Sequence, residues 1–459
     1  MMAANDPSHP IPRSPPELLD LYIDASKDSF PALSQLSLVS KRCMLRARKH
    51  MFDRIQLGRL VRYPWGPGEE DYVEAPDVIR INDLLALLNA NEMLATYPRY
   101  LDLDLGPFVG WDSTPGSDAD FAFTQALPTI LGSLHHLVSL RILSTGSNLP
   151  WDSLPMNMWA SVTTCCSGPR ITNLEFSGFT NFPFSLISSS PSLETLQLRV
   201  SGALVTPARA VPAQRIKTLI SPVPCCSLIM SYTPETFAGL ENFHWGVANQ
   251  SDWDGYSIVS WRARDSLRRV KLEFKTGGHP ISFDQGAPPL QGQVKHLTIS
   301  SQPRITIGGT PTFEPQTIFE LIRYTLRFQQ MLNSLESLTI EYSVPIMRLD
   351  PPMTDFIIGG NQDSWKALDD EISSSECRDR IKIEILFSVT VIKTRVEEGA
   401  SEGTEEEYQV LEGRMVEEVR AAMPRTAGNG RLETSFTFAS ATLSHLCPHA
   451  AHEGFSFVQ

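Results

Sequence analysis

Residues 193–198 read Leu-Glu-Thr-Leu-Gln-Leu, with leucine at the first, fourth and sixth positions. The same template, with other apolar residues in place of some leucines, recurs six more times in the chain. The seven copies occupy residues 137–142, 171–176, 193–198, 240–245, 267–272, 294–299 and 335–340. Partial copies lie at 101–103 and 216–219. The middle copies are spaced about 22–27 residues apart, which indicates a structural repeat.

The spacing within each copy predicts one short strand, because alternate side chains of a strand point to the same face. A single strand cannot bury its apolar face alone, so stacked copies must share one continuous core. Helix-like segments and Ser- and Pro-rich turns such as 188–191 separate the copies. We therefore expect an α/β chain with a solenoid over residues 98–395. An ordinary α/β domain with coincidental leucine spacing is the alternative.

Residues 11–60 differ from the repeats and predict three short helices. Pro15 and Pro16 suit a helix start, and Glu17 places a negative charge in the first turn. Apolar residues then recur at helical spacing. They are Leu18, Leu19, Tyr22 and Ile23 in the first helix, and Leu33, Leu36 and Val39 in the second. Residues 41–50 form a third, basic helix, and Ile55 and Leu57 indicate a first strand.

Three helices of this size cannot bury all of their apolar surface, so an exposed apolar stripe is expected. The segment resembles an F-box of the fungal type, through Pro15-x-Glu17-Leu18-Leu19, Ile23, and Leu38-Val39-Ser40-Lys41. It departs from that pattern at Ser14 and Cys43. The resemblance implies docking to a Skp-type adaptor of a cullin ubiquitin ligase. The adaptor-binding residues that it implies are Pro15, Glu17, Leu18, Leu19, Ile23, Val39, Ser40 and Lys41.

The repeat array is similar to the degenerate leucine-rich repeats of F-box proteins, although no regular asparagine follows its strands. The remaining chain is divided by composition. We expect a disordered tail at 1–10, a linker and capping helix at 61–97 with the helix over 78–97, an acidic loop at 396–410, and a C-terminal helix with a loose tail at 411–459, where Phe436 and Phe438 indicate a short strand. Within the array, residues 365–372 predict a helix with Asp369 on a solvated side, and residues 381–396 predict a strand.

Composition excludes several function classes. The net charge of −13 argues against nucleic-acid binding, because phosphate contacts need surplus cations. No apolar run reaches the length of a membrane helix, and residues 1–16 lack a signal core. Seven cysteines without a C-x-x-C spacing indicate a reducing compartment, with cysteine used as a small apolar residue. We therefore expect a cytoplasmic or nuclear protein with no membrane contact.

Few motifs suggest chemistry. Residues 399–403 read Gly-Ala-Ser-Glu-Gly, which matches the G-x-S-x-G elbow of hydrolases. The glutamates around Ser401 oppose a developing oxyanion, so we interpret the match as a loop. The run from His445 to His452 contains metal-competent side chains but reads as a polar tail. No phosphate-binding glycine motif is present, and we expect neither a cofactor, a metal site nor catalytic residues.

The sequence thus predicts a non-enzymatic substrate-recognition subunit of an SCF-type ubiquitin ligase. The N-terminal helices would bind the adaptor and the array would bind an unidentified target protein. A scaffold whose N-terminal helices only cap the solenoid is the second hypothesis, and a hydrolase that uses Ser401 is the third.

Overall fold

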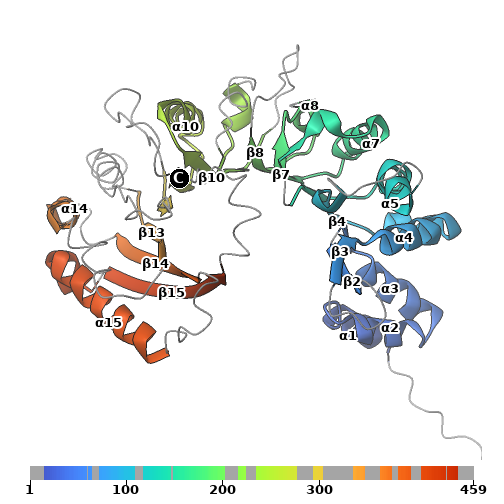
Figure 1. Ribbon diagram of the computed structural model, residues 1–459, viewed down its shortest axis with the longest axis horizontal. Coiled ribbons are helices and arrows are strands. Elements are labelled where there is room, and N and C mark those ends of the chain that lie inside the picture. Colours follow the sequence, from blue (N-terminus) through green and yellow to red (C-terminus); the bar gives the residue numbers. More distant parts are fainter. Residues whose placement is uncertain are drawn as a thin grey trace, which may run out of the picture.

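The structure is a computed structural model of the chain, and it describes most residues between 15 and 442. The described ranges are 15–58, 60–64, 72–108, 117–145, 148–183, 185–201, 215–223, 234–275, 293–302, 334–346, 362–374, 381–393, 405–430 and 432–442. The fold is an open arc of strands with helices along its outer side (Figure 1). The α/β class predicted from the sequence is confirmed.

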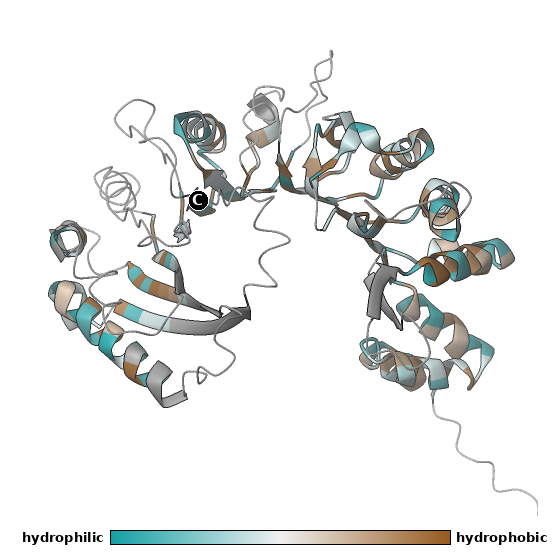
Figure 2. Ribbon diagram, in the orientation of Figure 1, coloured by the Kyte–Doolittle hydropathy of each residue, from teal (hydrophilic) through white to brown (hydrophobic). Residues whose placement is uncertain are grey.

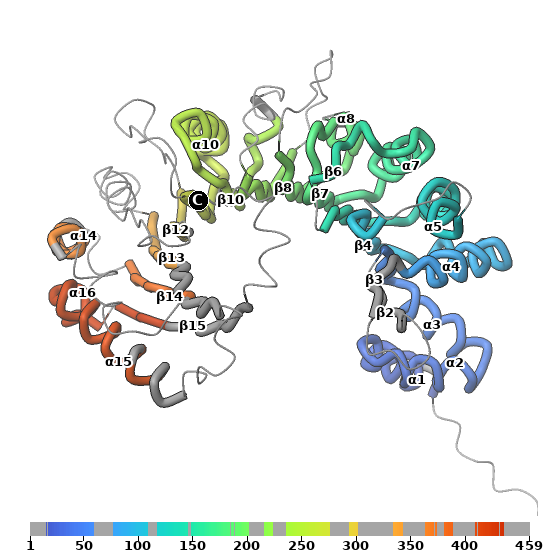
Figure 3. The backbone as a smooth tube through the Cα atoms, in the orientation of Figure 1, coloured from blue at the N-terminus to red at the C-terminus, as the bar shows by residue number. Residues whose placement is uncertain are grey.

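Within the described residues, a 13-stranded parallel sheet runs along the inner side of the arc (Figure 3). Its strands follow chain order, except that β6 pairs beside the main path with β7. They are β1 (Arg54–Leu57), β4 (Tyr100–Asp104), β5 (Ser139–Leu143), β6 (Leu149–Pro150), β7 (Asn173–Thr180), β8 (Thr195–Ser201), β9 (Thr218–Ser221), β10 (Asn242–Val247), β11 (Arg269–Lys275), β12 (His296–Gln302), β13 (Ser337–Ile346), β14 (Lys382–Lys393) and β15 (Leu432–Thr442). A separate antiparallel pair joins β2 (Leu60–Pro64) to β3 (Tyr72–Pro76).

The helices fall into an N-terminal group and a group that connects the strands. The N-terminal group is α1 (Pro16–Ala25), α2 (Phe30–Ser37) and α3 (Lys41–Met51). The connecting α-helices are α4 (Val78–Ala90), α5 (Asp118–Phe121), α6 (Leu127–Ser133), α7 (Met156–Cys166), α8 (Ser185–Ser188), α10 (Gln250–Arg262), α14 (Gln362–Ser374), α15 (Glu405–Ala422) and α16 (Pro424–Gly428). Short 3₁₀ or π turns are η1 (Glu92–Thr96), η2 (Gly106–Phe108), η3 (Ala122–Ala126), η4 (Trp151–Ser153) and η5 (Pro234–Phe237).

The template positions lie in register across the sheet. Leu101, Leu140, Leu174 and Leu196 are paired from strand to strand, and each is at most 1% exposed. The same row continues through β9 to β14 with Leu219, Phe243, Val270, Leu297, Leu338 and Ile383. Apolar residues of the connecting helices pack on this face and share its core. Because successive side chains of a strand point to opposite faces, the polar residues that alternate with these apolar ones lie on the other face of the sheet.

The last four residues of every predicted copy lie on an observed strand, and its first apolar residue precedes that strand. The strand predicted at 381–396 is present as β14 (Lys382–Lys393). The sheet is longer than the expected array of 98–395, because β1 precedes it and β15 follows it. Residues 62–76 were predicted as linker, yet residues 62–64 belong to β2 and residues 72–76 to β3, and these two strands pair. The helix predicted for 78–97 is present as α4 and η1.

The C-terminal predictions need three corrections. Residues 432–442 were assigned to a loose tail with a short strand at Phe436 and Phe438, but the whole segment forms β15, which pairs with β14 over its full length. Residues 405–410 were assigned to the acidic loop but belong to α15 (Glu405–Ala422). Asp369 was placed on a solvated side, but its side chain is buried because it binds backbone N–H groups of α16. Ser401, the run from His445 to His452, and the 1–10 tail lie outside the described residues.

Candidate protein-docking surfaces

Local sequence signals explain the three N-terminal helices. Pro15 and Pro16 stand at the start of α1, where a missing N–H has no helical partner to lose. The Ser29 hydroxyl caps α2 by accepting a hydrogen bond from the Ala32 N–H, at an N···O distance of 3.4 Å. The Ser40 hydroxyl caps α3 in the same way, with the Cys43 N–H at 3.2 Å. These caps place the turn at residues 38–40 between α2 and α3.

This three-helix module, residues 15–51, has a small core of its own. Ile23, Leu33, Cys43 and Ala47 are buried together, and Leu19, Leu36 and Met51 pack partly against them. Among the described residues, these side chains form a cluster distinct from the continuous core of the sheet and its helices. Phe52, the next residue after the module, packs instead against the core of the sheet. The module is therefore attached to the arc without sharing its core.

Large apolar side chains remain exposed on all three helices of the module. Leu38 is 79% exposed, Val39 is 63% exposed and Leu18 is 57% exposed. Leu21, Tyr22, Phe30 and Leu45 are also exposed. Figure 2 shows hydrophobic residues on α1, α2 and α3 at the end of the arc. Exposed apolar residues at this density are typical of a surface that binds another protein.

Ion pairs fix α1 against α3. Arg42 contacts Asp20 at 2.5 Å, Arg46 contacts both Asp20 and Asp24, and His50 Nε2 lies 2.8 Å from an Asp24 carboxylate oxygen. The hydrogen bond from Arg46 lowers the pKa of Asp24, and the contact with His50 lowers it further. The hydrogen bond from Arg42 likewise lowers the pKa of Asp20. Arg42, Arg46 and His50 of the predicted basic helix therefore contact carboxylates of α1 within the module.

The predicted adaptor-binding residues differ in how far the structure exposes them. Pro15, Glu17, Leu18, Val39, Ser40 and Lys41 are exposed near the starts of α1 and α3, which the Arg42–Asp20 ion pair joins. Leu19 is half-buried. Ile23 is 0% exposed and belongs to the core of the module, so its side chain cannot contact a partner. The prediction treated all apolar positions of the helices alike, because helical spacing identifies a face but not what covers it.

Five exposed apolar residues of the surface were not predicted as site residues. They are Leu21, Tyr22, Phe30, Leu38 and Leu45. Leu18, Leu21 and Tyr22 follow a spacing of three and four residues, so this part of the surface carried a helical signal. We define the exposed residues Leu18, Leu21, Tyr22, Phe30, Leu38, Val39 and Leu45 as the apolar docking surface.

The inner face of the sheet is the second candidate surface, and it is polar. Its side chains are linked across strands. Glu175 contacts Arg141 at 3.0 Å and accepts a hydrogen bond from Gln197 at 2.9 Å. His244 lies 3.1 Å from Glu273. A polar face on a paired sheet can bind a partner through side chains, because its interior backbone groups are already bonded.

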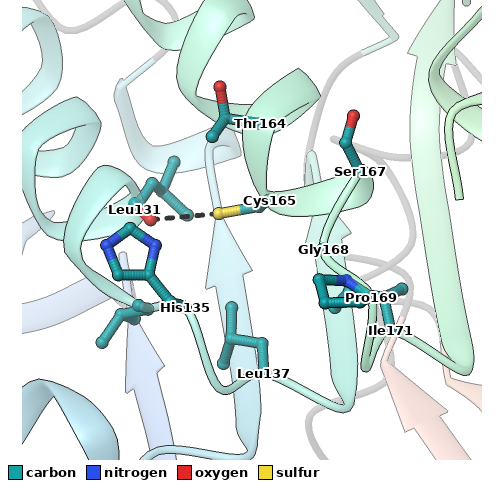
Figure 4. A pocket seen from close by; sticks show the side chains of 10 residues that line it. Leu131, His135, Leu137, Thr164, Cys165, Ser167, Gly168, Pro169 and Ile171 are labelled. Atoms are coloured by element: carbon teal, nitrogen blue, oxygen red, sulfur yellow. Dashed lines mark hydrogen bonds between the residues drawn. The ribbon is translucent and has the colours of Figure 1, made fainter.

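A cavity of about 320 Å³ lies between the ends of α6 and α7 and the turns that follow them (Figure 4). Cys165 and His135 both line it, which raises the question of a thiol nucleophile. The Cys165 thiol instead donates a hydrogen bond to the Leu131 carbonyl oxygen at 3.1 Å. Burial raises the pKa of Cys165 to about 12, so the thiolate is not populated near neutral pH. The cavity therefore lacks the chemistry of a cysteine–histidine catalytic pair.

Comparisons with known proteins were made for the whole chain. No protein-family model matches it, and no curated protein shows significant similarity. Among the described residues, no group of three or more His, Cys, Asp or Glu side chains is arranged to hold a metal ion. Across the same residues, no helix combines the length and apolar character needed to cross a bilayer.

Proposed function

We propose that the chain is a substrate-recognition subunit of an SCF-type E3 ubiquitin ligase. The three-helix module binds a Skp-type adaptor, which connects it to a cullin scaffold, and the strand array binds a target protein. We further propose that the array is a degenerate leucine-rich-repeat solenoid. The observation that carries the proposal is the apolar docking surface, exposed on a module that has its own core.

The energetic argument follows from the exposed area. Full burial of one Leu, Val or Phe side chain contributes about 1.5–3 kcal/mol. A partner helix that covers even three residues of the docking surface therefore gains several kcal/mol before ordering costs. Leu38 and Val39 lie side by side in sequence in the α2–α3 turn, where they are among the most exposed large apolar residues of the described chain. Such residues act as anchors when an apolar groove of a partner receives them.

The mechanism requires no chemistry from this chain. A target held on the array is kept near a charged conjugating enzyme that the cullin scaffold carries. Tethering of this kind raises the effective concentration of the target lysine and converts an intermolecular transfer into an intramolecular one. The continuous parallel sheet suits this role, because it offers a long face for the target beside the docking module.

In the scaffold hypothesis, the three N-terminal helices only cap the strand array and bind no adaptor. A capping module should place its apolar side chains on the first strand of the array. The distinct core of the module and the exposure of its remaining apolar residues favour docking over capping. The hydrolase hypothesis has no support in the described residues, since Ser401 lies outside them.

Co-purification with a co-expressed Skp-type adaptor tests the proposal. Leu18→Asp combined with Val39→Asp places charges on the docking surface at positions 57% and 63% exposed, so the fold should tolerate both. The matched control is Ile79→Asp with Met93→Asp, at positions 62% and 63% exposed on α4 and η1. We expect the first variant to lose the adaptor and the control to retain it. Absence of adaptor from the wild-type preparation, or its retention by the first variant, refutes the proposal.

A further inference from the structure

The inner face of the sheet has an uneven distribution of charge. Strands β8 to β12 carry four cations, Arg199, Arg269, Lys271 and Lys275, and one carboxylate, Glu273. In contrast, strands β4 to β7 carry three carboxylates and one arginine. A positive centre therefore lies on the inner face of a chain whose net charge is −13.

These cations all project from the inner face. On β11, Val270, Leu272 and Phe274 are buried, so the alternate residues Arg269, Lys271 and Lys275 lie on the opposite side. The same alternation on β8 buries Leu196, Leu198 and Val200, and leaves Arg199 exposed. His244 and His296 on the neighbouring strands pair in register with Lys271 and Arg269, respectively. We call these six side chains the central basic patch: Arg199, His244, Arg269, Lys271, Lys275 and His296.

Internal ion pairs leave part of this charge uncompensated. Lys271 contacts Glu341 at 2.5 Å, and Glu273 is paired with His244. Among the residues that the structure describes, the side chains of Arg199 and Arg269 have no hydrogen-bond or ion-pair partner, and only their backbone groups are bonded within the sheet. Both arginines are exposed, so they are available to carboxylates from outside the chain.

From this arrangement we infer that the central basic patch binds a short acidic segment of the target protein. The inference rests on the proposed function, since it specifies the target that the array recognises. Strands β8 and β11 are three strand spacings apart, or about 14 Å. About four residues of extended peptide span that distance. Arg199 is level with Glu273 along the strands, so Lys271 and Lys275 lie two residues to either side of its level. A segment with carboxylates about five residues apart can therefore contact Arg199 together with Lys271 or Lys275.

Charge at the borders of the patch favours a short peptide over a nucleic acid. Glu175 lies on β7 at one border, and Glu341 and Glu384 lie on β13 and β14 at the other. A long polyanion would extend over these carboxylates and be repelled there. An acidic peptide confined to β8–β12 is not opposed by Glu175 or Glu384, and the Glu341 carboxylate is already paired with Lys271.

Fluorescence anisotropy with the full chain tests the inference, with a labelled short oligoglutamate as the probe. Arg199→Gln with Arg269→Gln removes two charges from the patch. The matched control, Arg80→Gln with Arg420→Gln, removes two exposed charges from the helices α4 and α15. We expect the wild type and the control to bind oligoglutamate, and the patch variant to bind about fivefold or more weakly. Binding should also weaken as salt concentration rises.

Several outcomes overturn the inference. They are an equal affinity for oligolysine, an unchanged affinity in the patch variant, and tighter binding of an oligouridylate of matched charge, which would indicate a nucleic-acid site. Adaptor co-purification of the same variants separates this test from that of the proposed function. If the patch variant loses oligoglutamate binding but retains the adaptor, the result supports both the acidic-segment inference and the ligase assignment. Wild-type protein that binds oligoglutamate but no adaptor would refute the ligase assignment alone.

Discussion

The buried carboxylate of Asp369 on α14 accepts hydrogen bonds from the backbone N–H and the hydroxyl of Thr426 on α16, at 2.8 and 2.5 Å. Its second oxygen accepts a hydrogen bond from the Arg425 N–H at 3.0 Å. One side chain thus satisfies the first N–H groups of α16, which otherwise have no helical partner. This contact fixes the chain just before β15 joins the sheet.

We predict that Asp369→Ala lowers the free energy of unfolding of the C-terminal strands by about 2–3 kcal/mol, because buried N–H donors lose a charged acceptor. The matched control is Asp370→Ala. Asp370 is half exposed and loses only an ion pair with Arg425, so we expect a change of about 1 kcal/mol or less. Urea unfolding of the two variants measures the difference. Equal effects would show that the Asp369 contacts do not stabilise the fold.

Asp369 illustrates what the sequence could not show. Its neighbours Asp370 and Glu371 make the segment read as an exposed acidic stretch, and nothing local indicates that α16 will present N–H groups to it. The strands β5, β7 and β8 could be predicted, because their alternation and spacing are local properties. Strand β15 was only partly foreseen, from Phe436 and Phe438. Its pairing with β14 depends on contacts that sequence proximity does not encode.

The candidate site shows the same division. Helix positions and the exposure of Leu18 and Val39 followed from the pattern, whereas the burial of Ile23 did not. The difference depends on how the helices pack, because Ile23 shares the small core with Leu33 on α2 and with Cys43 and Ala47 on α3. The central basic patch was also not predicted, because its residues come from strands that are far apart in sequence and become neighbours only in the sheet.

A second prediction concerns Gly178, where the register between β7 and β8 shifts. Its φ of +78° is unfavourable for residues with a side chain, and a Cβ there would lie 2.1 Å from the Ser144 carbonyl oxygen. We expect Gly178→Ala to destabilise the protein by at least about 2 kcal/mol. Gly132→Ala on α6 meets no atom within 4 Å and should be neutral or stabilising by about 1 kcal/mol. Chemical denaturation measures the free energy of unfolding of both variants. A similar loss of stability in the two would contradict the close approach of the backbone at Gly178.

The ion pairs of the three-helix module predict a pH dependence. The pKa of Asp24 is lower in the folded protein than in the unfolded chain, so its stabilising contribution is fully present above about pH 4. That contribution is lost as the pH falls through the folded pKa. Asp24→Asn should therefore speed hydrogen exchange in α1 at neutral pH, and the difference from wild type should shrink in strong acid. The contribution is about 1 kcal/mol or less because the pair is partly exposed. A difference that stays constant with pH would assign the effect to something other than the Asp24 charge.

The two distinct cores predict that the module and the array open independently. Leu33 is 1% exposed in the small core, and Leu196 is 0% exposed in the core of the sheet. Truncation of either to alanine should cost about 2–4 kcal/mol locally. Because the small core has few members, Leu33→Ala should remove hydrogen-exchange protection from α1, α2 and α3 while β8 to β11 stay protected. Leu196→Ala should instead remove hydrogen-exchange protection from β8 to β11, while α1, α2 and α3 stay protected. If Leu33→Ala instead lowers protection equally in both regions, the module and the array form one cooperative unit. The helices would then act as a structural cap, and the exposed apolar residues would need an explanation other than an autonomous docking module.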